Sequence, residues 1–231
     1  MTTTALLLDV GNTLIYESPS RAGIYAAAAT GRGAPVEEET MRELMARAHR
    51  ELPRVVDGHY RYSDGWFAVF VERIFGGYLG LDAPSRAGLL EQLFERFEDP
   101  ATFRLFPGAV ELLTWARRAG LAVGVVSNWS ARLPRLLEAI DLARHLDFVV
   151  CSAIERTEKP ERRIFEIALE HAGATPAEAV HAGDHPVRDG AAANLGLEVV
   201  LVDHFGVHTG SNLPRVGDLG ALREWLEGRV G

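Results

Sequence analysis

The sequence predicts an α/β fold, in which a doubly wound, Rossmann-like parallel sheet forms the core and an all-helical segment is inserted into it. One observation is that short apolar runs alternate with helical patterns along residues 100–231. This order of strand, helix and strand is typical of right-handed crossovers in a parallel sheet. A second observation is that residues 17–99 show helical patterns alone. That stretch is too long for a single crossover, so we expect it to form a domain of its own.

Five apolar runs are predicted to be the strands of the sheet. Each run is apolar on both faces instead of alternating, as in strands that are buried on both sides. The first run opens the chain, and the other four follow the helical segment. They cover residues 5–10, 121–126, 146–150, 179–182 and 198–202.

Helical patterns separate these runs, and several of them end where a glycine follows. Residues 110–119 begin after Pro107-Gly108 and end before Gly120, a position where glycine often terminates a helix. The same pattern predicts helices at residues 131–139, 162–171 and 187–195.

The inserted segment is predicted to contain four helices and two long loops. We therefore expect residues 1–16 and 100–231 to form the core, and residues 17–99 to form a separate helical domain. The helices are predicted at residues 21–30, 37–51, 66–75 and 85–97, and the loops at residues 53–64 and 76–84.

The composition is that of an ordinary globular protein, with 47% hydrophobic and 24% charged residues among 231. A net charge of -8 disfavours nucleic acid and anionic membranes, so small molecules are the expected partners. No segment approaches the roughly 20 apolar residues of a membrane span, and the first residues lack the basic stretch of a signal peptide. The single cysteine, Cys151, is expected to be a buried apolar residue and suits a reducing compartment. We therefore expect a cytoplasmic location.

Polar residues lie at the ends of several predicted strands or in the segments that follow them. They are Asp9, Ser127, Lys159 and Asp184. Taken singly, each has a simpler structural explanation, because such residues also complete turns, cap helices or face solvent. Ligands of a parallel sheet bind at the carboxyl ends of its strands, however, so these side chains are expected to meet. Together they predict a site for a metal and an anion.

Four motifs that contain these residues occur in a fixed order along the core. They are Asp9-Val10-Gly11-Asn12-Thr13-Leu14, Ser127-Asn128, Lys159-Pro160, and Gly183-Asp184 with Asp189. With these motifs the chain resembles the haloacid dehalogenase superfamily. The resemblance implies that the helical segment is a cap of the first type, which closes over the site.

The resemblance also implies the reaction. Asp9 would be the nucleophile and would form an aspartyl intermediate that water hydrolyses. Thr13 and Ser127 would hydrogen-bond the transferring group, and Asn128 would add further donors. Lys159 would neutralise both Asp9 and the bound anion.

The metal that the resemblance implies is Mg²⁺, because all the expected ligands are hard oxygen donors. Asp184 would bind it together with Asp9 and the backbone carbonyl of Gly11. Asp189 would either ligate the metal through water or orient Lys159. We therefore expect a magnesium-dependent hydrolase that acts on a small phosphorylated compound.

Gly11 departs from the pattern of the superfamily's phosphatases, which usually carry a second aspartate there as general acid. Glycine keeps the carbonyl but supplies no proton, so we expect a pronounced preference for aryl esters, whose leaving groups are weak bases, over alkyl esters. Two alternatives stay open: a metal-independent 2-haloacid dehalogenase, and a weakly active member that binds a phosphometabolite or a protein. Gly183-Asp184 and Asp189 indicate a metal and so favour the phosphatase.

Other polar and aromatic residues carry less weight. His181 and His185 flank Gly183-Asp184; His185 could assist proton transfer, although a supporting or solvent-facing role is expected. A zinc pair of His204 and His208 is not expected, because Gly206 between them indicates a loop. Two further groups could contact the substrate or have only structural roles: Trp129, and the loop residues Arg54, His59, Tyr60, Arg61 and Tyr62.

Overall fold

The computed structural model describes residues 2–230 and divides the chain into two compact units. The sheet unit comprises Met1–Tyr16 and Leu105–Gly231, and the helical unit comprises Glu17–Arg104. The second boundary thus falls after Arg104 rather than after residue 99. The chain enters and leaves the helical unit through two strands that pair with each other, β2 (Ile15–Glu17) and β5 (Phe103–Leu105).

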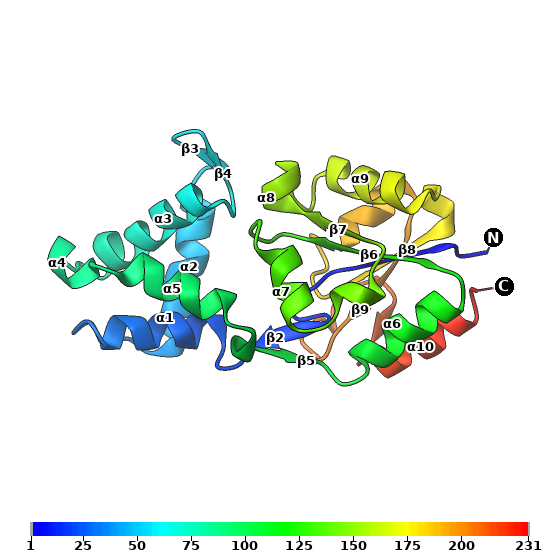
Figure 1. The fold of residues 1–231 in the computed structure, drawn as a ribbon, viewed down its shortest axis with the longest axis horizontal. Helices are drawn as coiled ribbons and strands as arrows, with labels where there is room; N and C mark the ends of the chain where they lie inside the picture. The colour runs from blue at the N-terminus through cyan, green and yellow to red at the C-terminus, as the bar shows by residue number, and fades with distance from the viewer. Residues whose placement is uncertain (1, 231) are drawn as a thin grey trace. The chain divides into compact units, whose positions relative to one another are not determined.

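The sheet unit is built on six strands in the order β10-β9-β8-β1-β6-β7 (Figure 1). All neighbouring strands in it are parallel. This arrangement confirms the predicted α/β fold, and the five predicted strands all belong to it. Their bounds are β1 (Ala5–Leu8), β6 (Ala122–Ser127), β7 (Phe148–Cys151), β8 (Ala179–Gly183) and β9 (Glu198–Val202), and the unpredicted β10 is the two-residue edge strand Arg215–Val216.

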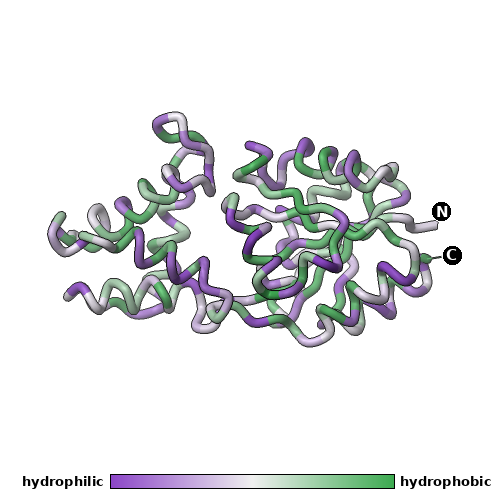
Figure 2. Tube along the Cα trace, viewed as in Figure 1, coloured by the Kyte–Doolittle hydropathy of each residue, from purple (hydrophilic) through white to green (hydrophobic). Residues whose placement is uncertain are grey.

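Helices cover both faces of this sheet. On one face α6 (Ala109–Arg118) lies beside α10 (Leu219–Glu227), and on the other lies α9 (Arg162–Ala172) (Figure 1). The central strand β1 is therefore fully buried, which explains its uninterrupted apolar sequence. Figure 2 shows this hydrophobic character along the strands. The shorter elements are α7 (Leu133–Ala139), α8 (Ser152–Glu155) and the 3₁₀ helices η3 (Ala143–His145) and η4 (Pro176–Glu178).

The predicted helix at residues 187–195 is wrong in its first three residues. A turn occupies residues 186–189, and only Gly190–Leu195 is helical, as the 3₁₀ helix η5. The backbone N–H groups of Val187 and Arg188 donate to Nδ1 of His185, each at 3.2 Å. The side chain of His185 therefore accepts hydrogen bonds from the backbone N–H groups at the start of the predicted helix, and a turn that leads to Asp189 forms instead.

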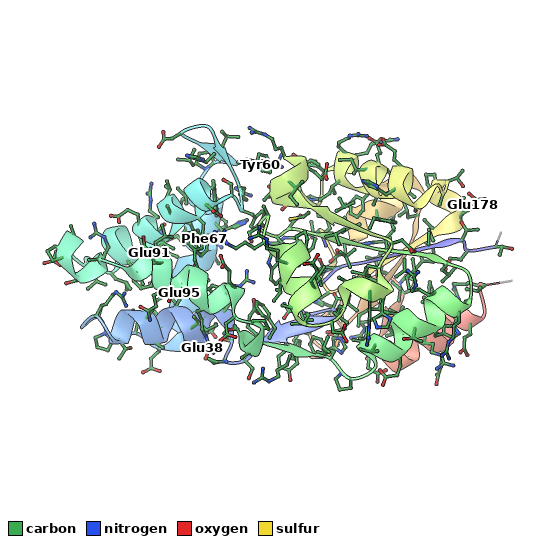
Figure 3. The ribbon with its side chains drawn as sticks, in the orientation of Figure 1. Glu38, Tyr60, Phe67, Glu91, Glu95 and Glu178 are labelled. Carbon is green, nitrogen blue, oxygen red and sulfur yellow. The ribbon has the colours of Figure 1, made fainter. Side chains whose placement is uncertain are left out.

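The helical unit is held together by an aromatic core. Tyr25 lies among Phe67, Phe70 and Phe75, with ring centroids between 5.8 and 6.5 Å from its own. Its principal elements are α1 (Arg21–Thr30), α2 (Glu38–Glu51), α3 (Asp64–Glu72), the π-helix η1 (Arg73–Tyr78), α4 (Ala83–Arg86), α5 (Leu89–Glu98) and the 3₁₀ helix η2 (Pro100–Thr102). On α5, Leu89 and Leu93 are buried, whereas Glu91 and Glu95 face solvent (Figure 3).

Two details of this unit differ from the prediction. The expected loop at residues 53–64 contains a small hairpin, β3 (Val55–Val56) and β4 (His59–Tyr60). Asp57 and Gly58 connect its strands, and both have positive φ, as a two-residue hairpin turn requires. The helix expected at residues 85–97 is divided into α4 and α5, because Gly88 adopts a φ of 69°. Within residues 2–230, no helix has both the length and the apolar character that a bilayer span requires.

Candidate active site

The site lies where the strand order of the sheet reverses. From β1 the chain proceeds to β6 and β7 on one side, and it then returns to β8 on the other side of β1. Ligands of such sheets bind at this point, beyond the carboxyl ends of the strands. Asp9 follows β1, Ser127 ends β6 and Asp184 follows β8. The topology therefore brings together residues that are far apart in the sequence.

Lys159 connects two carboxylates at the centre of the site. Its ammonium nitrogen lies 2.7 Å from Oδ1 of Asp9 and 2.6 Å from Oδ1 of Asp189. The lysine is only 3% exposed, which rules out the solvated role considered from the sequence. Burial by itself lowers the pKa of Lys159, but the charges of Asp189 and Asp9 outweigh burial and raise that pKa to about 12. Lys159 is therefore an ammonium ion at neutral pH.

Asp189 is fully engaged by protein donors. Its Oδ1 accepts from Lys159 and from Nε2 of His181 at 2.8 Å, and its Oδ2 accepts from the backbone N–H of His185 at 2.9 Å. Burial by itself would raise the pKa of Asp189, but the charge of Lys159 and these hydrogen bonds hold that pKa well below its usual range. A Cβ atom on Gly183 would collide with this carboxyl group, so glycine is required there. These contacts hold the carboxylate of Asp189 against the ammonium group of Lys159.

Asp184 is the carboxylate that most needs a cation. One of its oxygens lies within 4.8 Å of oxygens of Asp9 and Asp189. Burial, together with the negative charges of those two residues, raises the pKa of Asp184 to about 7. Nδ2 of Asn12 lies 3.4 Å from Oδ2 of Asp184, a long and weak hydrogen bond. Unlike Asp9 and Asp189, Asp184 has no ion pair with Lys159.

The three aspartates form a cluster that offers carboxylate oxygens to a divalent cation, above all from Asp9 and Asp184. Within residues 2–230, they are the one group of three metal-ligating side chains close enough to share an ion. All their donors are hard carboxylate oxygens, which Mg²⁺ prefers. A divalent cation would also remove the repulsion that raises the pKa of Asp184. The donor set therefore suits the metal that the sequence predicted.

Asn128 has a role that the sequence did not indicate. Its Nδ2 donates to the carbonyl of Lys159 at 2.9 Å, and its Oδ1 accepts from the N–H of the same residue at 2.8 Å. Both ends of the amide thus hold the backbone of Lys159, so Asn128 positions the lysine.

Two side chains with buried hydroxyl groups come from neighbouring strands. Thr13 lies in the loop after β1, and Ser127 ends β6. Thr13 is fully buried and its Oγ1 has no hydrogen-bond partner, while Ser127 is only 2% exposed. A buried hydroxyl without a partner is costly, and a bound anion would satisfy it. The carbonyl of Thr13 accepts from Nε2 of His204 at 3.0 Å, which fixes the loop after β1.

The remaining candidates have structural contacts. Arg61 donates to the backbone carbonyls of His49 and Leu52, which ties the hairpin region to the end of α2. Cys151 is fully buried, and burial raises the pKa of its thiol to about 11, so it is no nucleophile at neutral pH. His181 lies within the otherwise apolar, buried strand β8, where a histidine needs a polar partner, and that partner is Asp189.

Comparisons with known sequences agree with this arrangement. A family model described as a haloacid dehalogenase-like hydrolase matches residues 3–196. The haloacid dehalogenase-like hydrolase domain-containing protein 3 of Bos taurus is 34% identical over 203 residues, which cover 85% of this chain and 80% of that protein. The phosphoserine phosphatase of Thermus thermophilus is 35% identical over 224 residues, which cover 86% of this chain and 88% of that protein.

Solved structures have the same fold. A HAD phosphatase from Thermococcus onnurineus superposes with a TM-score of 0.69 at 25% identity, over 99% of this chain and 100% of that one. The L-2-haloacid dehalogenase of Xanthobacter autotrophicus superposes with a TM-score of 0.75 at 20% identity, over 98% of this chain and 99% of that one, which shows a shared fold alone. The chain therefore belongs to the haloacid dehalogenase superfamily of hydrolases and is a phosphatase-like member of it.

Proposed function

We propose that this protein is a magnesium-dependent phosphatase that hydrolyses a small phosphate monoester through a covalent intermediate on Asp9. The observation that carries the proposal is the buried ammonium group of Lys159 between Asp9 and Asp189, beside a third carboxylate, Asp184. Such an arrangement places a carboxylate nucleophile beside a positive charge, which also neutralises the charge of an incoming phosphate.

The first step is the transfer of the phosphoryl group to Asp9. Lys159 hydrogen-bonds Oδ1 of Asp9, and a carboxylate oxygen of Asp9 attacks phosphorus. A phosphorus–oxygen bond forms as the bond to the leaving group breaks, and the leaving oxygen takes the electron pair. The buried hydroxyls of Thr13 and Ser127 donate to the phosphoryl oxygens, whose negative charge Lys159 also stabilises.

The second step hydrolyses the intermediate. Water attacks phosphorus, the bond between phosphorus and Asp9 breaks, and the carboxylate is regenerated as inorganic phosphate leaves with the oxygen of the water. Lys159 stabilises the departing carboxylate, since Asp189 and the backbone contacts of Asn128 keep its ammonium group in place. The proton of the attacking water passes to phosphate or to solvent.

In this proposal Asp9, Asp184 and the backbone carbonyl of Gly11 hold the metal. When bound, Mg²⁺ supplies positive charge beside the phosphoryl group. Asp189 supports the site by orienting Lys159, because both of its oxygens already accept hydrogen bonds from the protein. The raised pKa of Asp184 supports this assignment, since it reflects burial first and then the negative charges of Asp9 and Asp189, which a cation would balance.

The relatives support the choice of substrate class. The Thermus thermophilus relative is a phosphoserine phosphatase, and the Thermococcus onnurineus structure is of a HAD phosphatase. We infer a small phosphate monoester for this chain as well, with the helical unit serving as the cap that selects it.

The proposal is tested with a panel of phosphate monoesters and 2-haloacids, each assayed with magnesium and with chelator. We expect phosphate release that requires magnesium. Halide release that persists in chelator would contradict the proposal and identify a dehalogenase. Binding of phosphorylated compounds without turnover of any of them would identify a weakly active binding protein instead.

A further inference from the structure

Gly11 is not required by its own backbone conformation. Its φ lies outside the left-handed region, whereas the following residue, Asn12, has a φ of 55°. The constraint comes from a neighbouring side chain, because a Cβ atom on Gly11 would lie 3.2 Å from Cζ3 of Trp129. This is tighter than an ordinary van der Waals contact, and a longer side chain would need still more of the space that the indole occupies. The indole thus crowds the space that a side chain at position 11 would enter.

The backbone of Trp129 is fixed by its surroundings. Its N–H donates to Oγ of Ser152 at 3.0 Å. Its carbonyl accepts from the N–H of Ala153 at 3.2 Å, from Oγ of Ser152 at 3.2 Å and from Sγ of Cys151 at 3.0 Å. Because these partners belong to β7 and α8, the indole cannot leave Gly11 through a backbone shift without breaking several contacts.

The indole approaches a position two residues after the nucleophile. Gly11 follows Asp9 by two residues, and Trp129 follows Ser127 by two residues, at the ends of the paired strands β1 and β6. Trp129 is only half-buried, so part of the residue reaches solvent. A substrate whose phosphoryl group is on Asp9 therefore has its organic part within reach of an aromatic surface.

We infer that Trp129 is a specificity-determining residue, which selects phosphate monoesters whose leaving group is flat, apolar and weakly basic, such as an aryl group. The inference rests on the proposed function and names its substrate class. A flat ring gains from contact with the indole by about 3- to 10-fold in affinity over a puckered ring of similar size. A weakly basic leaving group departs without a proton, which Gly11 cannot supply.

Binding tests the indole without any chemistry. We expect phenylphosphonate to bind the magnesium-loaded protein about 3- to 10-fold more tightly than cyclohexylphosphonate does, by calorimetry. Trp129→Leu should abolish this preference, and Trp129→Phe should keep most of it. Trp115→Leu is the matched control, because Trp115 is a half-buried tryptophan on α6, and it should change nothing. An unchanged preference in Trp129→Leu, or no binding of either phosphonate, would overturn the inference.

Turnover tests the pairing of Gly11 with Trp129. The native protein should hydrolyse phenyl phosphate at least about 100-fold faster than cyclohexyl phosphate. Gly11→Asp alone should help cyclohexyl phosphate little, because the indole occupies the space. Gly11→Asp combined with Trp129→Ala should raise the rate of cyclohexyl phosphate hydrolysis by about 10-fold or more.

Equal native rates on the two esters would overturn the inference about Trp129 but would not contradict the proposed phosphatase function. If neither ester is hydrolysed but the preference for phenylphosphonate depends on Trp129, the proposed phosphatase function is contradicted and the contact of Trp129 with the aromatic ring is supported.

Discussion

Charged side chains pair at the surface of both units, but the sheet unit also contains a buried group of them. In the helical unit they form ion pairs at the surface: Arg42 pairs with Glu38 and Glu39, and the side chains of Arg42 and Glu38 are 52% and 48% exposed. In the sheet unit Lys159 pairs with Asp9 and Asp189, and these three side chains are 2%, 10% and 1% exposed. Exposed pairs spaced by three or four residues contribute only a few tenths of a kcal/mol to stability.

The difference shows which charges serve folding and which serve chemistry. Burying an ion pair removes both partners from water, and packed apolar residues would often be as stable or more so. The sheet unit nevertheless gathers a lysine and two aspartates in one buried network, with Asp184 beside them. Buried charges with perturbed pKa values at the switch point of a parallel sheet are typical of an active site.

The largest effect is expected from Asp9→Asn. The amide keeps the shape of the side chain but is a far weaker nucleophile, so magnesium-dependent turnover should fall by at least about 1,000-fold. Circular dichroism and the unfolding temperature should show a folded protein. Glu39→Gln, which removes an exposed carboxylate of the helical unit, is the control and should keep full activity. Near-native turnover by Asp9→Asn would contradict the covalent mechanism.

Lys159→Met and Arg42→Met compare one cation from each kind of ion pair directly. We expect Lys159→Met to lower kcat by about 100- to 1,000-fold and the free energy of unfolding by about 2 to 4 kcal/mol, because buried carboxylates lose their counter-charge. Arg42→Met should change the free energy of unfolding by less than about 0.5 kcal/mol. Denaturant titration and steady-state kinetics measure both. Equal effects of the two substitutions would contradict the comparison.

The pH dependence of stability should reveal Asp184. Its pKa is raised from 3.8 to about 7 in the folded, metal-free protein. The unfolded chain therefore ionises first, and stability falls as the pH rises from about 4 to about 7, by on the order of 2 kcal/mol from this group. Added magnesium should restore stability at neutral pH. The measurement is denaturant unfolding with chelator and with magnesium across this range, and Asp184→Asn should flatten both responses. A fall that persists in this variant would show that another group is responsible.

The smallest effect is expected from His181, which contacts Asp189 but not Asp9. His181→Leu removes the donor to Oδ1 of Asp189 and should lower kcat by about 10-fold through a less well placed Lys159, with KM little changed. His181→Gln retains an N–H donor and should recover most of the rate. The unfolding temperatures of both variants provide the control. If His181 had a purely structural role, kcat would fall in step with stability in both variants.

The fold was predictable because its signals are local. Strands such as residues 198–202 are apolar on both faces, and the helix that begins at Arg162 has a glycine at its end. The hairpin was also predictable in principle, because Asp57-Gly58 between Val56 and His59 is a strong two-residue turn signal. The 3₁₀ helix η5 was not, because its shape depends on His185 and Asp189 accepting backbone hydrogen bonds.

The sequence was enough to predict which residues form the site, but not which contacts they make with one another. Strand ends and motif order pointed to Asp9, Lys159 and Asp184. The contact between Trp129 and Gly11 joins residues more than 100 positions apart, and nothing in the local sequence indicates it. The hydrogen bond of His181 to Asp189 likewise depends on which face of β8 the histidine occupies in the packed sheet.

The most direct test of the account is a rapid-quench experiment on the full chain with magnesium and phenyl phosphate. The account predicts that acid-quenched protein carries one phosphoryl group, and that peptide mass spectrometry locates it on Asp9. The adduct should form and decay at rates consistent with turnover, and it should be absent from Asp9→Asn. Phosphate release without any phosphorylated Asp9 at any quench time would contradict the account, because water would then attack the substrate directly.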